Sequence, residues 1–129
     1  MSERERTREA ASETVDSRPL GYERIETELL NDTLDLEREV ERFKSMAEPT
    51  RFTLLYLLAE EKRLESGELA DAVDRRQNDL YHHLNTLEDA GLVGKFRDGD
   101  SCVYELSPLA ESIVPQLFEA IGDRARATQ

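Results

Sequence analysis

The chain has 129 residues, enough for one domain around a single hydrophobic core. It has no apolar run long enough to cross a membrane, and its charged N-terminus lacks the apolar stretch of a secretory signal. We therefore expect a cytoplasmic protein with no membrane partner. The single cysteine, Cys102, excludes an internal disulfide framework and any zinc site built from several thiolates of one chain.

The charge is unusual. Asp and Glu number 29 against 17 Lys and Arg, which gives a formal net charge of −12. The only lysines are Lys44, Lys62 and Lys95. Taken alone, this balance argues against nucleic-acid binding, because phosphate contacts need basic residues. Abundant carboxylates with scarce lysine are also typical of proteins that work in molar salt, where self-repulsion is screened. The composition therefore favours a halophilic acidic protein, with an ordinary acidic protein that avoids nucleic acid as the alternative.

Residues 1–21 are densely charged and predict a flexible tail, followed by a single domain over residues 22–129. The tail contains Arg4, Arg6, Arg8 and Arg18, which could form an arm in the minor groove of DNA. The acids between these arginines favour a plain solvated tail instead.

The first half of the domain reads as helical. Apolar residues from Tyr22 to Ala47 follow a helical period, and Asn31 and Asp32 predict a break or a new helix start. After the break, Leu36, Val40 and Phe43 share one helix face. Pro49 then begins a helix that is apolar around much of its circumference, which predicts the buried centre of the fold.

The second half alternates short helices and strands. A short strand at Leu64 leads to a helix over Gly67–Val73 capped by Ser66, and a tight connection leads to a helix over Gln77–Ala90 that ends at Gly91. Strands are expected over Leu92–Arg97 and Ser101–Leu106, around the turn Asp98–Asp100. Ser107 and Pro108 begin a last helix, with the stripe Leu109, Ile113 and Leu117, that is expected to end at Gly122. This order predicts a mainly α fold with a small β-hairpin wing (α+β), a winged helix-turn-helix.

The helix over Gln77–Ala90 is the candidate for base recognition. Leu80, Leu84 and Leu87 recur at the spacing of one face and must point to the core. The outer face then carries Gln77, Asn78, Tyr81, His82 and Asn85, whose side chains can hydrogen-bond to bases and phosphates. Arg75 and Arg76 precede the helix, and Lys95 and Arg97 lie in the wing, so both pairs are candidate DNA contacts. An ordinary amphipathic surface helix is the alternative.

Several segments resemble the ArsR-type winged-helix regulators. Residues 46–58 are similar to the family's opening core helix, residues 67–73 to the first helix of its helix-turn-helix, and residues 79–93 to its recognition helix and exit. Residues 97–106 fit its wing, and the composition suggests a haloarchaeal member. The resemblance implies a homodimer that binds an imperfect palindrome in double-stranded DNA.

In this family the first and last helices form the dimer. The resemblance therefore implies an interface made of Leu36, Val40, Phe43, Leu109, Ile113 and Leu117. The alternative is that both stripes complete the core of the monomer.

The chain also departs from the metal-sensing members of the family. Residues 64–70 contain no thiol, and the last helix contains no histidine, so transition-metal sensing of those types is not expected. His82 and His83 are adjacent and make a poor chelating pair; we expect His82 to contact DNA and His83 to be partly buried. Cys102 lies on the inward face of its strand, which favours a packed core residue over a redox sensor.

The acids near the expected interface pose a problem, because phosphate repels Asp79, Asp98 and Asp100. Our hypothesis is that these acids share K⁺ or Mg²⁺ ions with the DNA backbone, since both groups offer oxygen ligands; no other cofactor is expected. The dispersed carboxylates and the absence of a phosphate-binding loop argue against an enzyme. A winged helix used for protein–protein contacts in the transcription machinery, or an architectural DNA binder, remains the alternative.

Overall fold

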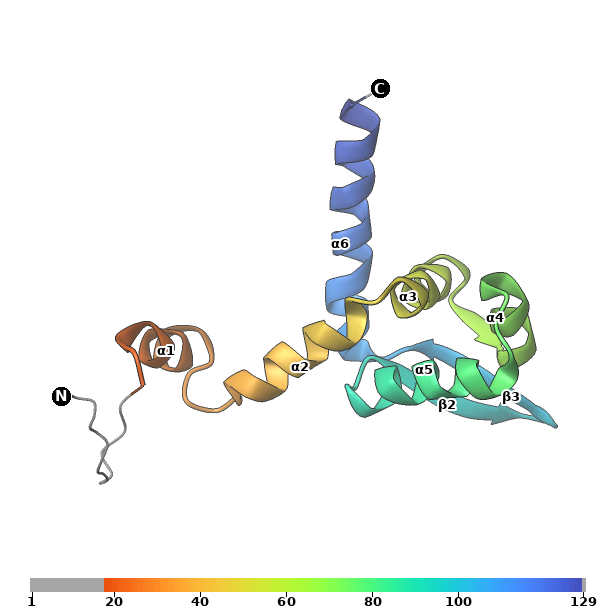
Figure 1. Ribbon diagram of the computed structural model, residues 1–129, viewed down its shortest axis with the longest axis horizontal. Coiled ribbons are helices and arrows are strands. Elements are labelled where there is room, and N and C mark those ends of the chain that lie inside the picture. The colour runs from red at the N-terminus through yellow and green to blue at the C-terminus, as the bar shows by residue number, and fades with distance from the viewer. Residues whose placement is uncertain (1–17, 129) are drawn as a thin grey trace. The chain divides into compact units, whose positions relative to one another are not determined.

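The computed structural model describes residues 18–128, which form helices and one small antiparallel sheet (Figure 1). The elements are α1 (Leu20–Arg24), the π-helical turn η1 (Ile25–Leu29), α2 (Leu36–Met46), α3 (Pro49–Glu61), β1 (Arg63–Glu65), α4 (Ser66–Val73), α5 (Gln77–Asp89), β2 (Val93–Asp98), β3 (Ser101–Leu106) and α6 (Pro108–Ala127). The sheet order is β1-β3-β2. Helices α4 and α5 with the β2–β3 hairpin confirm the predicted winged helix-turn-helix. Among the described helices, none is both long and apolar enough to cross a membrane.

By their internal contacts the described residues divide into two compact units with the boundary after Glu39, inside α2. The sequence predicted a tail to residue 21 and one domain after it. In the structure a helix already begins at Leu20, while Arg4, Arg6, Arg8 and the rest of the expected tail to residue 17 lie outside the described residues.

The helical break expected in the first unit is present. Asn31 and Asp32 both adopt positive φ, 55° and 54°, which ends the preceding helical segment. The new helix is capped by Asp35, whose carboxylate accepts a hydrogen bond of 2.9 Å from the backbone N–H of Arg38. Asn31 and Asp32 therefore make the break, and Asp35 caps the start of α2.

Helix α3 lies at the centre of the second unit, as its apolar sequence predicts. Leu54, Leu55 and Leu58 have no exposed surface. They belong to a core that also includes Leu69 of α4, Leu80, Leu84 and Leu87 of α5, Tyr104 of β3, and Ala110 and Val114 of α6. Helices α4, α5 and α6 and strand β3 thus each bury apolar side chains in the core around α3. The opposite face of α5 is exposed.

The register of the sheet decides which wing residues face the helices. Lys95 pairs with Tyr104 and Arg97 pairs with Cys102, so these four side chains point to the same side. Tyr104 is almost completely buried in the core, which identifies that side as the one on which the helices pack. The hairpin turns at Gly99 and Asp100, where Gly99 supplies the positive φ of 65°.

Two predicted helix ends were wrong. Ser66 does not cap α4; Glu65 does, in a capping box with Glu68, whose carboxylate accepts a 2.8 Å hydrogen bond from the backbone of Glu65. Gly122 does not end α6, which continues to Ala127. The residues after Gly122 include two alanines and two arginines, which are strong helix formers, and no proline follows to stop the helix.

Candidate nucleic-acid interface

The outward face of α5 presents a row of polar side chains. Gln77, Asn78, His82 and Asn85 are exposed, while the leucines of the same helix are fully buried. Within the part of the chain that the structure describes, no hydrogen bond occupies the side-chain amides of Gln77, Asn78 or Asn85. These donors and acceptors are available to an external partner.

Tyr81 is placed differently from its neighbours. The sequence grouped it with the outward face, but its ring is half-buried and packs against the core. Its hydroxyl lies 3.5 Å from Ser66 Oγ at the start of α4. The ring therefore packs against the core beside α4, with its hydroxyl next to Ser66.

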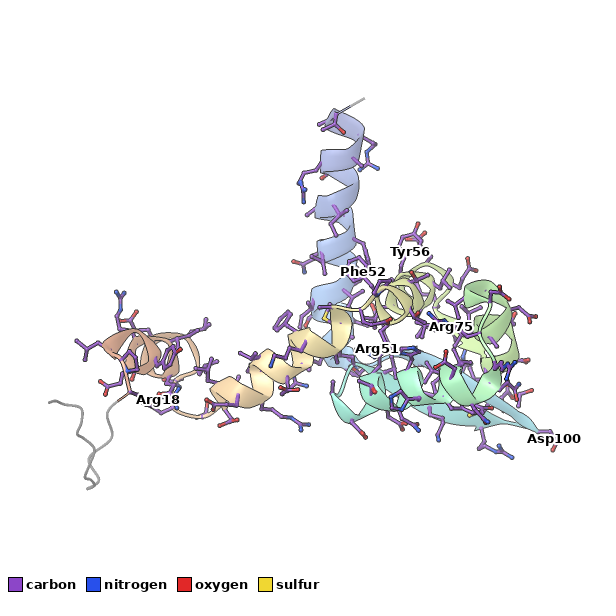
Figure 2. The ribbon with its side chains drawn as sticks, viewed as in Figure 1. Arg18, Arg51, Phe52, Tyr56, Arg75 and Asp100 are labelled. Atoms are coloured by element: carbon purple, nitrogen blue, oxygen red, sulfur yellow. The ribbon has the colours of Figure 1, made fainter. Side chains whose placement is uncertain are left out.

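The two arginines before α5 have different surroundings. Arg75 makes a 2.9 Å ion pair with Asp79 and a 2.9 Å hydrogen bond to Thr50 Oγ1 in α3. Figure 2 shows Arg75 beside the connection between α4 and α5. Arg76 is exposed and, among the described residues, has no such partner. Arg75 thus holds the first turn of α5 against α3, and Arg76 is the free cation of the pair.

A polar network under α5 was missed by sequence reasoning. The guanidinium of Arg51 donates to the carbonyl oxygen of Ser45 and lies 3.0 Å from Nδ1 of His83. Arginine has no acceptor, so Nδ1 accepts and the proton of neutral His83 is on Nε2. His83 is buried, as expected, and this bond ties the middle of α5 to the first turn of α3. The only sequence signal was a charged residue in the first turn of an apolar helix.

Glu48 completes this network. Its carboxylate caps α3 by accepting the backbone N–H of Arg51 at 2.9 Å, and it lies 3.8 Å from His83. Burial raises the pKa of Glu48, but the hydrogen bonds from the backbone N–H groups of Arg51 and Thr50 and the nearby positive charge of Arg51 outweigh it, so the net pKa is below the ordinary value. The carboxylate is therefore held in its charged form.

The wing supplies two further cations. Lys95 and Arg97 are exposed, lie on the helix side of the sheet, and have no ion-pair partner among the described residues. Asp98 and Asp100 are exposed at the tip of the hairpin. Asp79 is different, because Arg75 already neutralises it. Arg97 and Asp98 are neighbours in β2 and therefore point to opposite faces of the hairpin.

Cys102 is half-buried and packs against the core. Its neighbour Tyr104 is buried; burial first, and a hydrogen bond with Cys102 second, raise the pKa of Tyr104 far above its ordinary value. The thiol therefore lies in an apolar, hydrogen-bonded setting. Among the described residues, no cluster of three or more His, Cys, Asp or Glu side chains could hold a metal ion.

The two apolar stripes are only partly covered by their own chain. On α2, Leu36 is half-buried, while Val40 and Phe43 are 44% and 51% exposed. On α6, Ala110 and Val114 face the core, Leu109 is 38% exposed, and Ile113 and Leu117 are half-buried. Figure 1 shows the last turns of α6 extending away from the sheet. Both helices thus offer apolar surface to a partner.

Comparisons with known proteins agree with this architecture. A family model described as a helix-turn-helix domain matches residues 46–93. An HTH-type transcriptional regulator of Methanocaldococcus jannaschii is 36% identical over 49% of this chain and 71% of its own length. The arsenic resistance transcriptional regulator ArsR1 of Pseudomonas putida is 31% identical over 63% of each chain.

Solved structures give the same result. The winged helix-turn-helix DNA-binding domain of a possible ArsR-family regulator from Mycobacterium bovis, described as homodimeric, is 25% identical with a TM-score of 0.59, over 70% of this chain and 81% of that one. The matched residues contain α3, α4 and α5, whose geometry is that of a helix-turn-helix. The chain belongs to the HTH-type transcriptional regulators, and its winged helix-turn-helix is similar to that of ArsR-family members.

Proposed function

We propose that this protein is a sequence-specific regulator that binds double-stranded DNA as a homodimer and is adapted to high salt. The observation that carries the proposal is the outward face of α5, where the side chains of Gln77, Asn78 and Asn85 are exposed and make no hydrogen bond to residues 18–128. Amide side chains of this kind can form paired hydrogen bonds with adenine edges in the major groove. The exposed cations Arg76, before this helix, and Lys95 and Arg97, in the wing, have no ion-pair partner within the described part of the chain and suit phosphates.

The residues assigned to DNA fall into three groups. Gln77, Asn78, His82 and Asn85 read bases, and Arg76, Lys95 and Arg97 contact the backbone. Arg75 and Tyr81 act mainly through position: Arg75 holds the start of α5 against α3, and Tyr81 packs between α4 and α5. Their polar ends reach DNA only at the edge of the interface.

Homodimerisation is supported by the apolar stripes on α2 and α6 and by the homodimeric relative from M. bovis. A two-fold dimer places its recognition helices about one helical turn of DNA apart, which requires an imperfect palindrome.

The DNA proposal is tested by titrating a labelled duplex from the protein's own upstream region in molar KCl. Gln77→Ala and Asn78→Ala should each lose about 1–3 kcal/mol of specific binding. Thr53→Ala, an exposed change on α3, is the control and should bind like the wild type. Equal affinity for unrelated DNA would contradict sequence-specific binding and would indicate an architectural DNA binder instead. No binding at all would favour a protein–protein module.

The dimer is tested by sedimentation velocity. Val40→Asp and Leu109→Asp should each convert a species of twice the chain mass into monomer, because a charge would be buried in the apolar interface. Ser112→Asp, an exposed position of α6, should leave the dimer intact. A wild-type monomer at all concentrations would contradict the dimer without excluding DNA binding.

The acidic wing suggests how binding persists in salt. Counterion release weakens binding with a slope of roughly −0.9 in log K per phosphate contact, so it contributes little at molar salt. We propose that K⁺ or Mg²⁺ ions bridge Asp98 and Asp100 to phosphates; Asp79 contributes less because of its pairing with Arg75. The variant Asp98→Asn/Asp100→Asn distinguishes two cases. Simple repulsion predicts tighter binding by the variant, whereas ion bridging predicts weaker binding at molar KCl.

A further inference from the structure

A cavity of about 350 Å³ lies between α3 and α6, away from the outward face of α5. It is lined by Tyr56, Ala59 and Glu60 of α3 and by Pro115, Phe118, Glu119, Gly122 and Arg126 of α6. Figure 2 shows Phe52 and Tyr56 on the part of α3 that is near α6. Its volume is within the range of about 300–1,000 Å³ that is usual for small-molecule sites.

The wall of this cavity is aromatic. The ring of Phe118 lies 4.8 Å from that of Phe52 and 5.3 Å from that of Tyr56, and the contact with Tyr56 is edge to face. Tyr56 is still 44% exposed. A fixed aromatic cluster with an accessible ring attracts a cation to the ring face.

The α6 side of the cavity has an unusual composition for a helix. Pro115, Glu119, Gly122 and Arg126 follow one another at spacings of four, three and four residues, so they share one face. Proline and glycine inside a helix cost roughly 3 and 1 kcal/mol relative to alanine. Gly122 lets the guanidinium of Arg126 lie close to the helix backbone at the cavity, because an added Cβ would be only 3.3 Å from it. The face used for the proposed dimer, around Leu109 and Ile113, is a different one.

The charge of the lining selects the ligand. Glu60 and Glu119 place one carboxylate on each wall. The one lining cation, Arg126, is ion-paired with Asp123 and is compensated within α6. Two carboxylates beside an aromatic wall favour a positively charged organic group and disfavour an anion.

We propose that this cavity binds a small organic cation: an ammonium group seated between Glu60 and Glu119, with an apolar substituent against Tyr56 and Phe118. Such a ligand would link α6 to α3. If α6 forms the dimer, as proposed above, binding would also change the affinity for DNA; the site itself does not depend on that function.

The test is calorimetric titration of the full chain with benzyltrimethylammonium, with benzenesulfonate as the anionic probe and benzyl alcohol as the neutral one. We expect saturable binding of one cation per chain and no saturation by either control. Absence of saturable binding of the cation up to about 10 mM, or equal binding of the neutral alcohol, overturns the proposal. Because DNA plays no part in this measurement, its failure is separate from any failure of the DNA proposal.

Two sets of variants locate the site. Gly122→Leu fills the cavity and suits a helix, so it should abolish binding while the protein stays folded; Gly21→Leu in α1, where a Cβ meets nothing within 4 Å, is its control. Glu60→Gln/Glu119→Gln should weaken binding about three- to ten-fold, and Glu61→Gln, outside the lining, should not. Undiminished binding by Gly122→Leu would place the cation elsewhere and overturn the assignment.

Discussion

Three arginines close to α5 differ in role. Arg51 bonds to the Ser45 carbonyl and to His83, and Arg75 bonds to Asp79 and Thr50. Arg76 is exposed and unpaired among the described residues. The first two hold the helix, and the third is free to meet phosphate. Substitutions at Arg51 or Arg75 should therefore lower stability, whereas a substitution at Arg76 should weaken DNA binding.

Replacing Arg51 by Met should lower the free energy of unfolding by roughly 1–3 kcal/mol, because His83 and the Ser45 carbonyl lose their donor in a part-buried site. Arg76→Met should change it by no more than about 0.5 kcal/mol. In DNA titrations the Arg76 variant should instead bind more weakly, with a salt slope reduced by about 1. Urea unfolding and DNA titration together check the pair. Equal destabilisation by both substitutions would contradict the assigned roles.

The lowered pKa of Glu48 predicts a pH dependence of stability. A carboxyl group whose folded pKa is below its unfolded value contributes stability above the unfolded pKa, here about 4.5, and loses it as the pH falls through the folded pKa. Glu48→Gln should therefore be less stable than wild type at neutral pH, with the difference shrinking in acid. Urea unfolding at a series of pH values measures this. Glu61→Gln controls for the loss of one negative charge; a difference independent of pH would argue against the mechanism.

At the scale of elements, the start of α6 is fastened by one side chain. Ser107 Oγ accepts the backbone N–H of Ala110 at 3.1 Å and donates to the Gly91 carbonyl at 2.7 Å. The second bond joins the end of the α5 segment to the beginning of α6. The hydroxyl of Ser107 thus gives a backbone N–H of the first turn of α6 its acceptor and links α6 to the segment after α5.

Ser107→Ala should therefore cost more than an average helix cap, which is worth about 1 kcal/mol. We expect a loss of about 2 kcal/mol in urea unfolding, because the part-buried Gly91 carbonyl also loses its donor. Ser112→Ala, one turn further along α6, removes an exposed bond to Leu109 and should have little effect. Equal effects would mean that only local capping matters.

The sequence predicted helix starts and ends correctly only where a single residue could cap or end the helix. Pro49, Gly91 and Ser107 mark helix boundaries as their residue types suggest. At α4, however, two adjacent residues could cap, and the reciprocal bond from Glu68 favoured Glu65 over Ser66. Gly122 could have ended α6, but the helix-forming residues after it continue the helix.

At the scale of the whole molecule, the net charge of −12 predicts that stability depends on salt. Repulsion among exposed carboxylates destabilises the folded state at low ionic strength, and the screening length falls to about 3 Å at 1 M. The melting temperature should rise from low to molar KCl. Neutralising the exposed acids Glu61, Asp71 and Glu111 should reduce that rise. A melting temperature independent of KCl would count against adaptation to high salt.

The sequence by itself determined the order of helices and strands, the buried leucines and the polar face of α5, because these follow from hydrophobic period, caps and turns within short segments. Only the tertiary structure decided that, among the described residues, Arg75 is paired while Arg76 is not, that Tyr81 turns toward α4, and that α3 and α6 line an open cavity. Each depends on contacts between residues that are distant in the chain, such as Arg75 with Thr50. Local patterns show which face of a helix is polar, whereas long-range packing decides which of its side chains are available.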